Sequence, residues 1–153
     1  MFSRETSRQS SLDKSRDKSG QEKQKTAKRK LGDLGERIFV KHLVKHRYEI
    51  LDRNYQKKWG EIDVVAKKDD VIHFFEVKTM KLGFEKLESG DYYNPEENVH
   101  YYKQKRLARA IQIYLVQKKI PENQECQVDV AAVFLDFRRR RARIRITQDI
   151  DLA

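Results

Sequence analysis

The stretch GEIDVVAKKDDVIHFFEVK, residues 60–78, decides the fold of this chain. β-Branched and aromatic residues dominate the runs on either side of Asp69 and Asp70, and such residues favour strands. Two aspartates between two strand-like runs are typical of a tight turn. We therefore predict a β-hairpin whose turn is centred between Asp69 and Asp70.

The position of this turn predicts which side chains face each other. Opposed residues have numbers with the same sum, so Asp63 faces Glu76, and Glu61 faces Lys78. Directly opposed residues share a face of the sheet, and alternate residues of one strand share that face too. The four side chains are therefore expected to converge on one patch.

This patch has the residue types of a metal site. Asp63 and Glu76 repel each other across the ladder unless a cation lies between them. Mg²⁺ is usually held by one or two carboxylates together with waters and a substrate phosphate. The two acids are thus candidate ligands for Mg²⁺ or Mn²⁺, and Lys78 is placed to orient a water or to stabilise charge on a phosphate. The pattern predicts metal-dependent phosphodiester hydrolysis.

A fourth candidate lies in a preceding helix. Leu34, Ile38 and Leu43 form a loose apolar stripe over Leu31–Lys45, which predicts an amphipathic helix. If this helix packs on the hairpin, Glu36 reaches the same metal.

A structural interpretation of the patch stands beside the metal site. A salt bridge from Glu61 to Lys78, with Asp63 exposed, would need no ligand, and the residues of the hairpin alone leave both interpretations open. The charges do stand in a strand that is otherwise apolar, where unpaired charges are rarely tolerated.

Residues spread along the chain resemble a known family. They are Gly32, Gly35-Glu36, Arg53-Asn54, Gly60-Glu61-Ile62-Asp63, Phe75-Glu76-Val77-Lys78, Pro95, Val99, Lys103, Arg106, Leu107, Ala110 and Val128-Asp129-Val130. In this order, over residues 31–146, they resemble the YraN-like family of bacterial endonuclease-like proteins. That family is similar to the restriction-endonuclease-like superfamily and to archaeal Holliday junction resolvases.

The resemblance implies roles for named residues. Asp63, Glu76 and Lys78 match the catalytic set, and Glu36 matches an accessory acid. One departure from the pattern follows the lysine, which the family usually continues with Thr-Arg, whereas this chain has Thr79-Met80. The departure removes a cation that could contact a phosphate.

Composition bounds the class of protein. A chain of 153 residues is long enough for one domain with a core. It has no apolar run long enough to span a membrane or to act as a signal peptide, so we expect a cytoplasmic protein. The single cysteine, Cys126, excludes an intramolecular disulfide and agrees with a reducing compartment.

The positive charge is uneven. Residues 1–30 hold ten Lys and Arg against four acids, a net of 10 − 4 = +6 out of a total of +10. We expect residues 1–25 to form a disordered basic tail, because they have too few apolar residues to fold alone, and residues 26–153 to form the endonuclease-like domain. The tail is either a solvated extension or a non-specific nucleic-acid arm.

Two further basic segments are candidate nucleic-acid contacts. Six arginines fall within residues 138–145, and their alternation with Ala142, Ile144 and Ile146 predicts a strand with one basic face. This face could clamp phosphates or simply deter aggregation at a sheet edge. A helix expected from Pro95, capped by Asn94, to about Lys119 supplies other cations. The candidate contacts are Arg138, Arg139, Arg141, Arg143, Arg145, Lys103 and Arg106.

The sequence therefore predicts an α/β fold with a restriction-endonuclease-like core, in which helices flank a mixed central β-sheet. The predicted function is a Mg²⁺-dependent endonuclease acting on DNA, with branched or damaged DNA as candidate substrates. A non-catalytic nucleic-acid-binding module of the same fold is the main alternative, and an RNA-processing nuclease is the third. The expected partner is nucleic acid, with no membrane, and a homodimer is left open.

Overall fold

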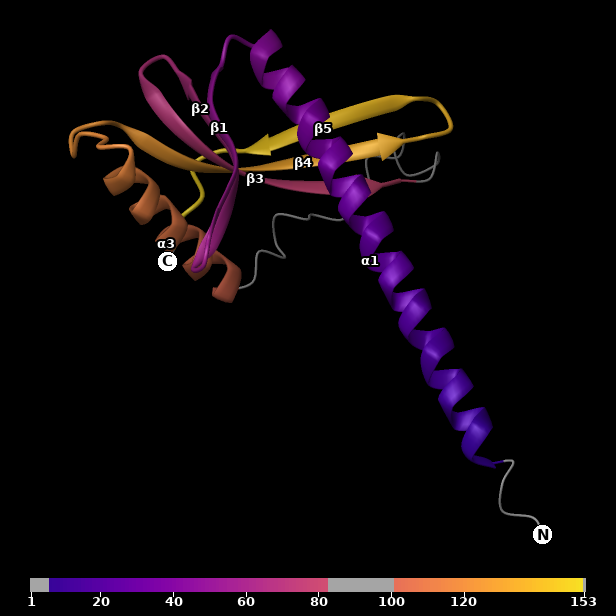
Figure 1. Ribbon diagram of the computed structural model, residues 1–153. Coiled ribbons are helices and arrows are strands. Elements are labelled where there is room, and N and C mark those ends of the chain that lie inside the picture. Colours follow the sequence, from indigo (N-terminus) through magenta and orange to yellow (C-terminus); the bar gives the residue numbers. More distant parts are fainter. Residues whose placement is uncertain (1–5, 83–100, 153) are drawn as a thin grey trace.

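The described part of the chain folds as a five-stranded sheet with a helix on each face (Figure 1). The computed structural model describes residues 6–82 and 101–152, with side chains for residues 23–82 and 102–152. Its elements are α1 (Thr6–Lys45), β1 (Glu49–Lys57), β2 (Gly60–Lys68), β3 (Val71–Lys81), α3 (Tyr101–Gln117), β4 (Cys126–Asp136) and β5 (Arg141–Thr147).

The strands lie in the order β1-β2-β3-β4-β5. β3 and β4 run parallel, joined through the part of the chain that contains α3, and the other neighbouring pairs run antiparallel. The predicted mixed α/β sheet is confirmed, and it is compatible with a restriction-endonuclease-like core.

The predicted hairpin and its register are confirmed. β2 and β3 pair from Lys68 opposite Val71 to Val64 opposite Phe75. Asp69 and Asp70 have φ angles of 48° and 69°. Positive φ at both central residues matches a type I′ turn, which fits the twist of the flanking strands, and aspartate tolerates this conformation better than most residues.

β2 and β3 diverge beyond this ladder. Towards its start, β2 pairs with β1, where Gln56 lies opposite Glu61. Past Phe75, β3 continues beside β4 as far as Lys81. Asp63 and Glu76 are therefore the first residues beyond the β2–β3 ladder. The expected pairing of Glu61 with Lys78 is wrong, because the strands have separated at that point.

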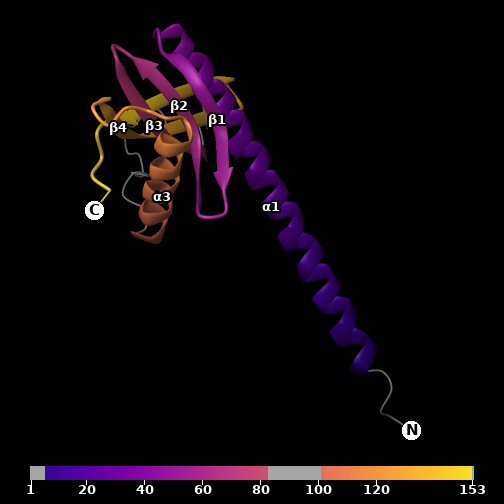
Figure 2. The ribbon, with the colours of Figure 1, turned by 60° about the vertical axis from the view of Figure 1, so that its left-hand side comes forward.

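A bend in β1 and β2 coincides with this separation. Ile62 and Val65 pack on the α3 side of the sheet, whereas Val64 packs on the α1 side, so strict alternation is broken at Asp63. On β1 the neighbouring residue is Asn54, whose φ is 49°. Figure 2 shows the β1–β2 ribbon curving towards α3. The bend turns the Asp63 side chain out of the regular sheet pattern.

Two cores hold the layers together. On the α3 side, Ile72 and Phe74 pack with Leu107 and Tyr114. On the α1 side the buried residues are Phe39, Leu43, Val64, Ala66, Phe75, Ala131, Val133 and Leu135. Each fully buried large apolar side chain contributes about 1.5–3 kcal/mol relative to exposure.

Two glycines allow helices to approach the strands closely. A methyl group on Gly35 of α1 would overlap the Thr79 side chain of β3, and one on Gly60 of β2 would overlap the backbone carbonyl of Arg106 in α3. Both glycines are thus needed for packing, and both stand next to candidate acids, Glu36 and Glu61.

The helices differ from the expected ranges. α1 begins at Thr6 rather than at Leu31, and its N-terminal part projects away from the sheet (Figure 1). The division of the chain at residue 25 stays a prediction. α3 ends at Gln117, while its expected start at Pro95 and its cap Asn94 lie outside the described residues. No helix within the described ranges is long and apolar enough to cross a membrane.

Candidate active site

Glu76 is the centre of the predicted site. It lies on β3, points to the same side as Phe74, and is 2% exposed. Its Oε1 is 2.9 Å from Lys78 Nζ, and Lys103 Nζ, which comes from α3, contacts the same oxygen. Lys103, one of the candidate nucleic-acid contacts, lies half-buried in the site, where two ammonium groups share one carboxylate.

Asp63 lies where β2 leaves β3. Its Oδ2 accepts a hydrogen bond of 2.7 Å from the backbone N–H of Val77. This donor belongs to the part of β3 beyond the ladder with β2, so the carboxylate takes the place of a strand partner. Burial, followed by the charge of Glu76, raises the pKa of Asp63 to about 8. Asp63 is therefore mostly protonated at pH 7 without a metal.

The two acids open into adjoining hollows instead of one cleft. Glu76 lines a cavity of about 300 Å³ with Lys103, Arg106 and other residues of α3. Asp63 lines a cavity of about 500 Å³ with Glu36, and Glu61 lines both. The expectation of a single cleft is corrected in this respect, because the sheet divides between the acids.

Glu36 reaches the Asp63 side of the site. Burial, and next the charge of Asp33, raises the pKa of Glu36, while Arg53 and a hydrogen bond from the Asn54 side chain act in the opposite direction. Within the described residues, no group of three or more His, Cys, Asp or Glu side chains is arranged to hold a metal ion. The assignment of Asp63 and Glu76 as a metal-binding pair stays a prediction.

The two lysines respond differently to the site. Burial lowers the pKa of Lys78, although Glu76 opposes that change. Burial also acts to lower the pKa of Lys103, but Glu76 outweighs it, and the pKa of Lys103 is raised. The cation supplied by α3 is therefore the more firmly charged of the two.

The basic strand shares a face with Lys78. Lys78 pairs with Ala132 on β4, and Ala132 pairs with Arg145 on β5. The guanidinium of Arg145 lies 5.2 Å from the Phe134 ring centre. Arg141 and Arg143 alternate with apolar residues on β5, as expected.

The remaining predicted arginines lie in the β4–β5 turn. Arg138 and Arg139 use their backbone N–H groups to bond Asp136 Oδ1, at 3.0 and 3.1 Å. Both side chains are exposed. On β3 and β4 the last pair that contains a site residue is Lys78 with Ala132, and Arg138 and Arg139 follow the end of β4 at Asp136. The structure therefore does not bring these two arginines to Glu76.

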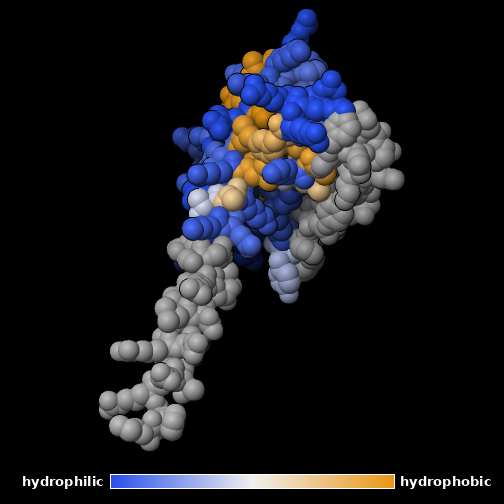
Figure 3. Space-filling model, turned by 90° about the vertical axis from the view of Figure 1, so that its right-hand side faces the viewer, coloured by the Kyte–Doolittle hydropathy of each residue, from blue (hydrophilic) through white to orange (hydrophobic). Residues whose placement is uncertain are grey.

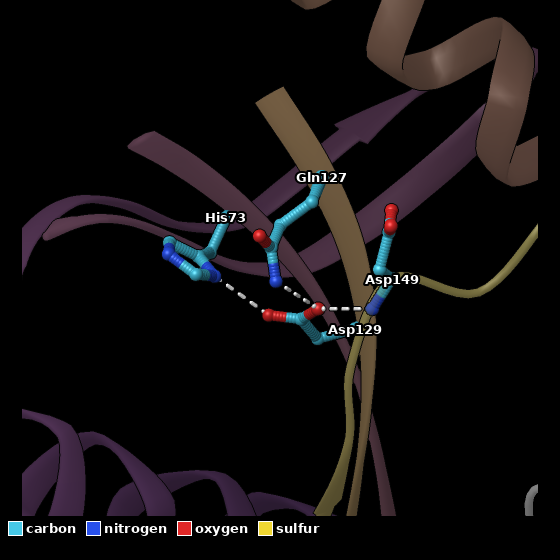
Figure 4. Close-up of polar contacts among 4 residues, drawn as sticks. All are labelled: His73, Gln127, Asp129 and Asp149. Atoms are coloured by element: carbon cyan, nitrogen blue, oxygen red, sulfur yellow. Dashed lines mark hydrogen bonds and ion pairs between the residues drawn. The ribbon is translucent and has the colours of Figure 1, made fainter. Parts of the chain in front are cut away.

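A second buried acid was missed by the sequence analysis (Figure 4). Asp129 is fully buried, and a bond of 2.7 Å joins its Oδ2 to His73 Nδ1. Its Oδ1 accepts hydrogen bonds from Gln127 Nε2 at 2.8 Å and from the backbone N–H of Asp149 at 2.9 Å. The sequence signal that could have found it is a single acid between two apolar strand residues. Asp129 lies between Val128 and Val130, just as Glu76 lies between Phe75 and Val77.

The sequence is similar to proteins from several bacteria. A sequence model of the Uncharacterised protein family UPF0102 matches residues 35–133. A UPF0102 protein of Alkaliphilus metalliredigens is 40% identical over 105 residues, which cover 69% of this chain and 85% of the relative. One from Caldicellulosiruptor bescii is 32% identical over 121 residues, covering 79% and 96%.

The matched range contains most of the site. It includes Glu36, Asp63, Glu76, Lys78 and Lys103, and it ends before β5. The YraN-like resemblance found from the residues is thereby confirmed at the level of the family.

Proposed function

This chain belongs to the Uncharacterised protein family UPF0102, and we propose that it is a Mg²⁺-dependent endonuclease that hydrolyses phosphodiester bonds in DNA. The observation that carries the proposal is the position of two acids, the partly buried Asp63 and the buried Glu76, beside Lys78 at the point where two strands separate. Nothing in the packing of the cores requires charges there.

The residues fit a divalent metal. Asp63 has a pKa raised by burial and by Glu76, so a cation that binds both carboxylates would relieve their repulsion. Mg²⁺ commonly takes one or two protein carboxylates and completes its shell with water and phosphate, so the absence of a third ligand among the described residues suits it. When bound, the metal supplies a polarised phosphoryl oxygen and a more acidic water. Mn²⁺ fits the same ligands.

The protein's own groups supply the rest of the chemistry. Lys78 and Lys103 both carry ammonium groups at Glu76. A substrate phosphate entering the cavity would meet these donors, and Lys78 would hold the attacking water or stabilise the charge that develops on phosphate. Arg106, which lines the same cavity, would contact a neighbouring phosphate. Glu36 acts as an accessory acid from the Asp63 side.

The nucleic-acid path in this proposal follows one face of the sheet. Arg145 lies two strands from Lys78 in the same row, about 10 Å away by strand spacing. Arg141, Arg143, Arg138 and Arg139 would continue the contacts, and residues 1–25 would add a non-specific arm. A cytoplasmic location is part of the proposal, since such substrates occur there.

One observation favours the non-catalytic alternative. Glu76 is already neutralised by two lysines, so its charge has structural partners without a metal. In that case the fold would bind nucleic acid through its arginines, and Met80 would mark a lost phosphate contact.

A cleavage assay tests the proposal. The purified chain is incubated with linear, nicked, four-way and single-stranded DNA and with RNA, each with Mg²⁺, Mn²⁺ or chelator. We expect metal-dependent cleavage of DNA that Glu76→Gln abolishes, while Glu49→Gln, an exposed acid at the start of β1, has no effect. Binding without cleavage of any substrate would support the binding module, and cleavage of RNA alone would reassign the substrate.

A further inference from the structure

An apolar groove lies between α1 and the β4–β5 turn, on the face of the sheet opposite Glu76. Two hollows of about 320 and 500 Å³ meet there, and both are lined by Leu34 and Phe137. Phe137 is 50% exposed, which is unusual for a phenylalanine at a turn. Figure 3, which looks at this side of the molecule, shows an apolar patch with hydrophilic residues along much of its border.

The border of this groove is basic. Its exposed cations come from α1, from the end of β3 and from the β4–β5 turn, and they are Lys28, Lys30, Lys81, Arg140 and Arg141. The acid among the described lining residues, Asp136, is 4% exposed and accepts the backbone N–H groups of Arg138 and Arg139. The groove therefore presents apolar surface within a ring of positive charge.

We propose that this groove binds an acidic peptide segment that carries apolar side chains. Exposed apolar patches with a polar border mark interaction sites, and complementary charge sets the register and the rate of association. Two adjoining hollows suit two apolar anchors, and the five cations suit acidic residues between and beside them. The groove lies on the α1 face, so this binding does not depend on the proposed nuclease site.

Other occupants fit the groove less well. Nucleic-acid bases stack on aromatic faces, but Leu34, Ile38 and Leu135 are aliphatic, and Lys81 Nζ lies 5.4 Å from the centre of the Phe137 ring. A second copy of the chain carries a net charge of +10, which disfavours its approach to a basic rim.

The test uses a fluorescein-labelled octapeptide with one Phe and one Leu among six Asp, followed by fluorescence polarisation. Two control peptides separate the contributions: one replaces Phe and Leu by Ser, and the other replaces every Asp by Asn. We expect the parent peptide to bind and each control to bind at least about tenfold more weakly, because apolar burial and charge each contribute.

Matched protein variants locate the site. Phe137→Ser should weaken binding about tenfold, whereas Val116→Ser, an exposed apolar residue on α3, should not. The double change Lys28→Ser with Lys30→Ser should also weaken binding, and Lys23→Ser with Lys25→Ser should have less than about a twofold effect. All four lysines are exposed on α1, so misfolding cannot explain the difference.

Three results would overturn the proposal. Equal binding of the serine control peptide would reduce the interaction to unspecific charge. If the protein binds oligo-dT but not the peptide, and Phe137→Ser abolishes the binding of oligo-dT, the groove is a nucleic-acid site. Self-association that Phe137→Ser abolishes, measured by light scattering, would assign it to a second copy.

Discussion

Two acids of this sheet, the fully buried Asp129 and the partly buried Asp63, are held in opposite ways. Asp129 has three partners from its own chain, His73, Gln127 and the backbone of Asp149 (Figure 4). Asp63 accepts one hydrogen bond, from the Val77 N–H, and lies near a second carboxylate, that of Glu76.

The difference teaches which acid serves the fold and which is available to a ligand. A buried polar group with all its partners in the chain stabilises one structure, whereas adjacent carboxylates cost stability until a cation joins them. The Asp129 cluster holds the segment that follows β5 against β4. The backbone N–H of Asp149 bonds the Asp129 carboxylate, and the N–H of Ile150 bonds the Val128 carbonyl at 2.8 Å. The contacts of Asp63 and Glu76 are instead with the Val77 N–H and with the ammonium groups of Lys78 and Lys103.

The largest expected effect is on cleavage. Asp63→Asn and Glu76→Gln should each lower the rate of DNA cleavage by at least about 10² to 10³, because each removes a charge that acts on the transition state. Metal-free DNA binding should be tightened by Glu76→Gln, which removes negative charge near the phosphates, and preserved by Asp63→Asn, because Asp63 is mostly protonated without a metal. Single-turnover rates and polarisation binding measure the two. Activity within a few-fold of the parent would remove these acids from the mechanism.

The second prediction concerns stability at the other acid. Asp129→Ala should lower the free energy of unfolding by about 3–5 kcal/mol, because it leaves buried partners without their acceptor. Asp149→Asn is the matched control, since Asp149 contributes only its backbone N–H to the Asp129 carboxylate and Asn tolerates its φ of 52°. Urea unfolding of both variants measures the difference. A loss of less than about 1 kcal/mol for Asp129→Ala would mean that the cluster is not structural.

The sequence predicted the local parts of the fold better than the distant ones. The hairpin register followed from Asp69 and Asp70, because a tight turn fixes the pairing of its own strands. The bend at Asp63 and Asn54 depends on how β1 and α3 pack, so alternation alone could not place it.

The site shows the same division between local and distant information. Glu76 and Lys78 are two residues apart on one strand, and their position on one face was predicted. Lys103 comes from α3, and its contact with Glu76 depends on where that helix crosses the sheet. His73 and Asp129 are 56 residues apart, and their bond joins parallel strands whose register no turn specifies. Tertiary packing decides both the Lys103–Glu76 contact and the His73–Asp129 bond, and the local sequence pattern does not contain that information.

The third prediction is a dependence of stability on pH that belongs to Asp63. Folding raises the pKa of Asp63 from 3.8 to about 8. Between these two pH values the carboxyl group of Asp63 is deprotonated in the unfolded chain and protonated in the folded protein. Rising pH from 4 to 8 therefore lowers the free energy of unfolding of the metal-free protein.

Asp63→Asn removes this contribution. In the presence of chelator, the melting temperature of Asp63→Asn minus that of the parent should increase from pH 5 to pH 8. Mn²⁺ should reduce this difference, because it binds the folded parent and stabilises it. Glu49→Gln, at an exposed acid of β1, is the control. Parallel pH profiles for the parent and Asp63→Asn would show that Asp63 is not buried beside Glu76.

The smallest expected effect separates a metal from the cation that α3 supplies. Lys103 Nζ contacts the Glu76 oxygen that a metal would use, so the ammonium and the metal compete for one carboxylate. Lys103→Met keeps most of the apolar stem and removes the charge, and we expect it to raise Mn²⁺ affinity about three- to tenfold, a free-energy change of about 1 kcal/mol. Lys105→Met, on the same helix, should leave Mn²⁺ affinity unchanged. Isothermal titration measures both without any cleavage, so the outcome is independent of whether a substrate has been found. Should Lys103→Met bind Mn²⁺ no better than the parent, Glu76 is not a metal ligand, and its two lysines serve the fold as the partners of Asp129 do.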